Sequence, residues 1–108
     1  MITFDQFKQV ELRVGEIIAV NRIVGADKLL QLTIDFGDEA RTAVAGIALV
    51  YTPNQLVGKR VIAVTNLEPA IIRGVRSEAM ILASGDENDL SLVLSDPERP
   101  APKGARVR

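Results

Sequence analysis

KLLQLTIDF, residues 28–36, alternates without interruption between two kinds of side chain. From Leu29 onward one set is mostly polar and the other is entirely apolar, and the apolar set consists of Leu30, Leu32, Ile34 and Phe36. A period of two is typical of a β-strand with one buried face, because successive side chains of a strand point to opposite sides. The stretch therefore predicts a strand that lays its apolar side on a core.

Extended segments continue on both sides of this strand. Residues 12–23 are rich in β-branched side chains and include Gly15, at a position where a strand can bulge or bend sharply. A turn at Gly37 and Asp38 lets residues 41–45 pair back as a hairpin. Three further extended segments are expected at residues 60–65, 79–83 and 90–94.

Proline and glycine mark the irregular parts of the chain. Residues 66–77 contain Pro69 and Gly74 and are expected to form a loop, and residues 85–89 are expected to form a polar turn. From residue 97 onward, three prolines predict a stiff, non-helical C-terminal extension that ends in basic residues.

Two short helices are predicted by the same N-terminal signal. TFDQ at residues 3–6 and TPNQ at residues 52–55 are capping boxes, in which the Thr hydroxyl and the Gln side chain satisfy free backbone amides. Phe4 and Phe7 lie on one face of the first helix. Proline suits the first turn of the second helix, and Gly58 supplies its stop.

These elements predict an all-β domain that occupies residues 1–108 as a single unit. Five or six short strands, with one short helix between the third and fourth, suit a five-stranded Greek-key barrel of the oligonucleotide/oligosaccharide-binding (OB) type. A short N-terminal helix and the C-terminal extension would flank the barrel. A β-sandwich is the alternative, but it needs about seven strands.

Composition limits the class of protein. Of the 108 residues, 47% are apolar and 25% are charged, which is the balance of an ordinary folded domain. The longest apolar run, Ala43–Tyr51, is about half of the ~20 residues that a membrane helix needs. We therefore expect a cytoplasmic protein without a membrane segment, and the lack of cysteine fits a reducing compartment.

The sequence lacks the residues of common catalytic and metal sites. There is no histidine and no cysteine, so the usual nucleophile arrangements and metal ligands are missing. Ser77 between two charged residues is expected to form surface hydrogen bonds, and the acidic residues at 86–89 lack the spacing of a calcium loop. We expect no enzymatic activity, no metal and no cofactor.

Charge is unevenly distributed along the chain, although the formal net charge is only −1. Residues 59–76 carry four cations against one acid, and residues 99–108 carry four cations and no acid. Acidic residues gather at 27–39 and 86–98. Folding could build one positive and one negative face, or a mixed and merely solvated surface.

A family resemblance spans nearly the whole chain. It rests on Gly46, Ile47, Ala48, Tyr51, Thr52, Pro53, Leu56, Gly58 and Lys59, then Asn66, Leu67, Pro69, Arg73, Gly74, Ser77 and Met80, with LRVG at 12–15 and Asp27 to Leu29 before them. In these residues the chain resembles the tRNA-binding domain that is appended to methionyl-tRNA synthetases and also occurs as a free-standing, structure-specific tRNA-binding protein.

The resemblance implies an OB-fold homodimer, joined through its N-terminal region and C-terminal extension, that grips the outer corner of tRNA without reading sequence. A methionyl-tRNA synthetase is a further implied partner. Lys28, Arg73 and Arg76 would meet phosphates, while Asn66 and Ser77 would offer neutral hydrogen bonds. The last implied site residue, Met80, would add a soft apolar contact.

Alternatives remain open for single residues. Met80 could be a core residue and Asn66 a turn cap beside Pro69. Aromatic residues make up 4% of the chain, and most of them occupy positions that look buried, which favours recognition of RNA shape over base stacking. Departures from the family pattern at Glu68, Ile71 and Ala79 imply weaker affinity or a different partner.

Two other functions are compatible with the same fold. One branch resembles a bacterial export chaperone that binds unfolded polypeptide, but that branch carries Ser-Ala-Gln near Gly46 and Phe-Pro-Pro near residues 67–69, where this chain has Gly-Ile-Ala and Leu-Glu-Pro. The other alternative is a dimerisation module of a synthetase, in which contact with tRNA is secondary.

Overall fold

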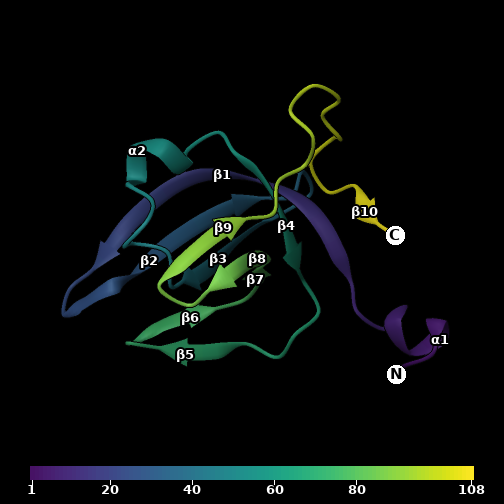
Figure 1. Ribbon diagram of the computed structural model, residues 1–108, viewed down its shortest axis with the longest axis horizontal. Helices are drawn as coiled ribbons and strands as arrows, with labels where there is room; N and C mark the ends of the chain where they lie inside the picture. Colours follow the sequence, from purple (N-terminus) through teal and green to yellow (C-terminus); the bar gives the residue numbers. More distant parts are fainter.

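Two long antiparallel strands, β1 (Leu12–Ile23) and β2 (Ala26–Asp35), form the central hairpin of the computed structural model, which describes all residues 1–108. Around them lies an open antiparallel sheet in the order β3-β2-β1-β4-β7, with β10 also paired to β1 (Figure 1). The added strands are β3 (Ala40–Ala45), β4 (Arg60–Val64), β7 (Met80–Ile81) and β10 (Arg106–Val107). The prediction of a mostly β protein is confirmed.

Two separate hairpins lie outside this sheet. They are β5 (Ala70–Ile72) with β6 (Val75–Ser77), and β8 (Ala83–Asp86) with β9 (Asp89–Leu92). The prediction that residues 66–77 form only a loop is therefore wrong. The β5–β6 turn is made by Arg73 and Gly74, both with positive φ, of 51° and 80°. Paired positive φ angles match the twist of a two-residue hairpin, but arginine seldom occupies such a position, so Gly74 was interpreted as part of a loop and not of a hairpin turn.

The predicted fifth strand at residues 79–83 is shorter in the structure. Only Met80 and Ile81 pair with β4, and β8 begins at Ala83 in a different hairpin. The backbone between them is not free, because the Leu82 amide donates to Ile62 O at 2.9 Å and Leu82 O accepts from the Val93 amide. The extended segment therefore changes partners at Leu82.

Both predicted helices are present as single turns, α1 (Phe4–Phe7) and α2 (Pro53–Leu56). In α1 the Thr3 amide donates to Gln6 Oε1 at 2.8 Å, and the Gln6 amide donates to Thr3 Oγ1 at 3.2 Å. In α2 the Thr52 amide donates to Gln55 Oε1 at 2.8 Å. At four residues each, neither helix has the length to cross a bilayer.

The main core is built on the apolar face of β2. Leu30, Leu32, Ile34 and Phe36 are all buried, as the alternation predicts. They pack with Ile17 of β1, Ile47 of the loop after β3, Leu56 of α2 and Val61 of β4. The residues of β2 that point the other way, such as Gln31 and Thr33, are only half-buried.

A second, smaller cluster covers the opposite face of β1 and β4. It consists of Leu12, Val14, Ile62 and Val64, with Ala101, Ala105 and Val107 of the C-terminal segment packed against it. Backbone hydrogen bonds hold this segment in place, from the Gly104 amide to Val14 O at 2.7 Å and from the Val14 amide to Ala105 O at 2.9 Å. The predicted C-terminal extension is therefore a cover for the outer side of the sheet.

Ion pairs fasten this cover to the β2–β3 turn. Arg13 donates to Asp38 at 2.8 Å and to the carbonyl oxygens of Gly104 and Phe36, and the Lys103 ammonium lies 2.8 Å from Asp35 Oδ2. The Lys103 ammonium lowers the pKa of Asp35, and the Arg13 guanidinium lowers the pKa of Asp38. Both carboxylates are thus held ionised beside their cations.

Gly15 is required by close packing in the main core. A Cβ at this position would lie 2.4 Å from Ile34 Cγ2 and 2.7 Å from Phe36 Cε1, both of which belong to buried side chains. Such distances are far below van der Waals contact. The Phe36 ring occupies the space that a side chain at position 15 would need.

We predict that Gly15→Ala lowers the free energy of unfolding by about 1–3 kcal/mol, the usual cost of overpacking a core. Gly46→Ala is the matched control, because its Cβ would meet only Leu29 Cδ2, at 3.9 Å. Urea unfolding of both variants measures the difference. Equal stability of the two variants would contradict this account of Gly15.

Candidate nucleic-acid interface

The β5–β6 hairpin carries two exposed arginines. Arg73 lies in its turn and forms no ion pair, and Arg76 lies on β6 opposite Ile71. The Arg76 side chain is 63% exposed, and its nearest acidic partner, Glu78 Oε2, is 3.9 Å away. Exposed pairs of this length contribute little, so both guanidinium groups remain available to an external anion.

Ser77, in contrast, is buried and fully engaged. Its hydroxyl donates to Ala79 O at 3.2 Å and accepts a hydrogen bond from the Val44 amide at 3.1 Å. One residue further, the Glu78 amide donates to Thr42 O at 2.8 Å. Ser77 therefore joins the end of β6 to strand β3, and its one donor is already used.

The Asn66 side chain is also occupied within the protein. Its Oδ1 accepts from the Glu11 amide at 2.8 Å, and its Nδ2 donates to Gln9 O at 2.6 Å. These bonds tie the loop after β4 to the segment that precedes β1. The amide holds the N-terminal segment rather than capping its own turn beside Pro69.

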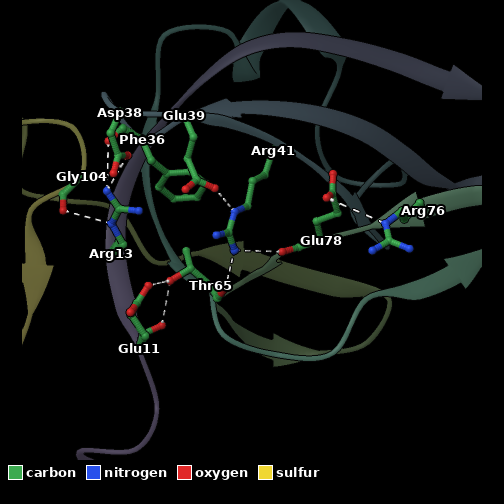
Figure 2. A network of polar contacts seen from close by, with 10 residues as sticks. All are labelled: Glu11, Arg13, Phe36, Asp38, Glu39, Arg41, Thr65, Arg76, Glu78 and Gly104. Carbon is green, nitrogen blue, oxygen red and sulfur yellow. Dashed lines mark hydrogen bonds and ion pairs between the residues drawn. The ribbon is translucent and has the colours of Figure 1, made fainter.

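An arginine that the sequence did not single out organises this end of the sheet. Arg41 of β3 donates to the carbonyl oxygens of Thr65 and Glu78 and pairs with Glu39, while Thr65 Oγ1 donates to Glu11 Oε1 at 2.5 Å (Figure 2). The neighbouring Glu39 carboxylate raises the pKa of Arg41. Only long-range partners reveal this role, because Arg41 belongs to no recognisable motif.

Met80 is 51% exposed on β7, so its interpretation as a core residue is wrong. It borders a groove of about 210 Å³ together with apolar side chains of β3, β5 and the loop before β5. The polar lining of this groove comprises Glu68, Ser77 and Glu78 and includes no cation. Of the three positions at which the chain departs from the family pattern, Glu68 and Ala79 lie at the groove. The third, Ile71, is exposed and lies opposite Arg76 in the hairpin.

Lys28 lies on a different hairpin. It is an exposed residue near the start of β2, and its ammonium donates to Asn88 Oδ1 in the β8–β9 turn at 3.3 Å. In Figure 1 the turns of the β1–β2, β5–β6 and β8–β9 hairpins point toward the same side of the molecule. The structure thus brings Ser77 and Met80 together at the groove, leaves Arg73 and Arg76 exposed on the β5–β6 hairpin, and places Lys28 against the β8–β9 hairpin.

The fold and this surface define a small β-sheet binding domain with exposed cations on a hairpin. Residues 12–106 match the family described as putative tRNA binding domain, and the chain belongs to this family. The family assignment drawn from the sequence is confirmed.

Relatives of several kinds share this domain. The methionine–tRNA ligase of Methanothrix thermoacetophila is 50% identical over 106 residues, which are 98% of this chain but 16% of the relative. The chain therefore spans about a sixth of the length of such curated relatives. A methionyl-tRNA synthetase-related protein from Pyrococcus horikoshii has a TM-score of 0.92 at 36% identity, with 100% of this chain and 98% of that chain covered.

A second structural neighbour carries a different description. The chaperone CsaA from Bacillus anthracis has a TM-score of 0.90 at 27% identity, with 100% of this chain and 99% of that chain covered. The same backbone fold therefore occurs in a protein described as related to methionyl-tRNA synthetase and in a protein described as a chaperone.

We predict that Ser77→Ala lowers the free energy of unfolding by about 1–3 kcal/mol, because the half-buried Val44 amide loses its partner. Ser91→Ala is the control, since Ser91 is exposed and its side chain makes no hydrogen bond within the protein. Denaturant unfolding measures both. Hydrogen exchange at Val44 should accelerate in the first variant only, and unchanged exchange there would contradict the bridging role of Ser77.

Proposed function

We propose that this chain is a non-catalytic module that binds folded tRNA by its backbone and shape, independently of sequence. The observation that carries the proposal is the family match over residues 12–106, joined to two unpaired or weakly paired arginines on one exposed hairpin. Arginine suits phosphate because its planar guanidinium can donate two parallel hydrogen bonds.

The six expected site residues divide into two groups in this proposal. Arg73, Arg76 and Lys28 meet phosphates, and Met80 adds an apolar contact to a ribose or base. Asn66 and Ser77 act as positioning residues, because their hydrogen-bonding atoms are bound to Gln9, Glu11, Val44 and Ala79 in the free protein. A hydrogen bond donated by the Ser77 hydroxyl to tRNA would require breaking its bond to Ala79 O.

Shape recognition is supported by the environment of the aromatic residues. Phe36 is buried in the core, and the Tyr51 hydroxyl accepts from the Leu92 amide at 3.1 Å. Neither ring is free to stack on a base, and stacking platforms are what sequence-tolerant single-strand binders use. The exposed Phe4 and Phe7 belong to α1, which lies at the other end of the molecule from the β5–β6 turn (Figure 1).

We further propose that residues 1–108 form one domain of the OB type. Two contacts support closure of the open sheet into a barrel, the Ser77–Val44 bond and the Glu78–Thr42 bond, because they join β3 to the segment that leads into β7. The helix α2 between β3 and β4 also fits this topology. Both core clusters draw residues from β1 and β4, which is consistent with a single folded unit.

We expect Arg73→Ala and Arg76→Ala each to weaken tRNA binding roughly three- to tenfold and to reduce the slope of log affinity against log salt by about 1. The loss should be similar for all tRNA species, because phosphate contacts carry no sequence information. Fluorescence anisotropy of labelled tRNA at several salt concentrations measures this. Arg99→Ala is the control, since Arg99 is exposed on the C-terminal segment.

The same titration separates the alternative functions. Loss of binding for one tRNA species alone would contradict shape recognition. Two observations support the polypeptide-binding alternative. The groove beside Met80 is mostly apolar and includes two carboxylates but no cation, and the fold is similar to that of the chaperone. Displacement of tRNA by an unfolded polypeptide, or a lack of tRNA binding at low salt, would favour that function.

We propose a methionyl-tRNA synthetase as the functional context, with the module either appended to the enzyme or acting beside it in the cytoplasm. The methionine–tRNA ligases in which the matching segment is a small share of the chain support this context. In that setting the module would raise the effective concentration of tRNA near the catalytic body by adding a second contact.

We propose that the chain forms a homodimer through α1 and the C-terminal strand. Phe4 is 73% exposed, and Phe7 and Val10 are also exposed, so the expectation that most rings are buried is wrong for this helix. Together with Val107 and three cations, Lys8, Arg106 and Arg108, these side chains line a cavity of about 360 Å³. Contiguous exposed apolar side chains of this kind are typical of an interaction surface, and a second copy would cover them.

The double variant Phe4→Ser/Phe7→Ser should be monomeric, whereas the unaltered chain should sediment as a dimer at micromolar concentration. The control is Val24→Ser, because Val24 is fully exposed in the β1–β2 turn, away from α1 in Figure 1. Analytical ultracentrifugation measures all three proteins. A monomer for the unaltered chain, or a monomer for the Val24 variant alone, would overturn this dimer.

A further inference from the structure

The β8–β9 hairpin presents three carboxylates that no cation neutralises. Asp86, Glu87 and Asp89 are exposed, and none of them takes part in an ion pair or in a side-chain hydrogen bond. Asp86 and Asp89 face each other directly across the two-residue turn. Like charges in such a cross-strand pair destabilise a hairpin. The acids therefore do not serve the stability of the element that carries them.

This hairpin contacts one of the proposed tRNA-binding cations. The Lys28 ammonium donates to the neutral Asn88 amide at 3.3 Å, with Glu87 and Asp89 on either side of Asn88 in the chain. Adjacent residues are ~3.4 Å apart along a strand, and charges interact over ~8 Å at physiological salt. A phosphate bound at Lys28 would therefore approach a turn that carries a carboxylate on each side of Asn88.

We propose that the acidic turn of the β8–β9 hairpin is a specificity-determining element that repels general polyanions from Lys28 and so favours folded tRNA over straight duplexes. The inference rests on the proposed tRNA binding. A negative charge beside a binding cation makes the binding free energy of a phosphate at that cation less favourable. The contact at Lys28 then forms only when the same RNA also binds Arg73 and Arg76. Selectivity then arises from a repulsive group rather than from an added attractive one.

The test compares two variants of equal charge. The turn variant is Asp86→Asn/Glu87→Gln/Asp89→Asn, and the control is Asp5→Asn/Asp96→Asn/Glu98→Gln, which removes three acids from exposed positions in α1 and the C-terminal segment. Both retain side chains of nearly the same shape. Fluorescence anisotropy gives the affinities of each protein for a tRNA transcript and for a 24-base-pair duplex RNA at one salt concentration, and thermal melting checks that both variants fold.

We expect the turn variant to bind the duplex about five- to tenfold more tightly than the control variant does, with a smaller gain for tRNA, so that the ratio of tRNA affinity to duplex affinity falls. Asn88→Asp should act in the opposite direction, because it places a carboxylate against the Lys28 ammonium; tRNA binding should weaken while the unfolding temperature stays within a few degrees.

Equal affinity ratios for the turn and control variants would overturn the inference and leave the proposed function intact. A failure of the unaltered protein to bind tRNA at low salt would overturn the proposed function, and the inference with it. Stronger duplex binding in both variants alike would show an effect of net charge alone, and would also refute a role specific to this hairpin.

Discussion

Burial of β1 and β4 on both faces is the constraint on which the rest of this structure depends. Along β4, Val61 and Ala63 face the main core, while Ile62 and Val64 face the second cluster. A strand in this position needs a cover on each side, and the C-terminal segment supplies the outer one. On the inner side Phe36 packs closely against Gly15, and on the outer side Arg13 and Lys103 form the ion pairs that hold the cover in place.

The polar residues near the proposed interface fall into two groups, those that form hydrogen bonds within the protein and those that do not. Ser77, Asn66 and Arg41 are satisfied by hydrogen bonds to carbonyl and amide groups of other elements. Arg73 and Arg76 project from the β5–β6 hairpin with little to hold them. Breaking such bonds is costly, above all for the buried Ser77, so these three side chains hold the fold together while the two arginines are free for a ligand.

Local patterns in the sequence predicted most of the elements and little of the site. The alternation at residues 28–36 and the capping box at Thr3 gave a strand and a helix where the structure has them. The β5–β6 hairpin was missed, because its turn places an arginine at positive φ and carries no asparagine or aspartate. Most aromatic residues were expected to be buried, but Phe4 and Phe7 lie exposed on a four-residue helix that contributes no buried residue to the core.

The sequence by itself determined a β protein with one strongly apolar strand face, two capped helical turns and no histidine or cysteine chemistry. These properties are local, because they depend on side-chain period and on residues three positions apart. The tertiary structure alone decided which polar side chains are free and which cation lies beside the acidic turn. The contacts that decide this join residues far apart in the chain, 33 positions for Val44 and Ser77 and 60 for Lys28 and Asn88, and no periodicity encodes such partners.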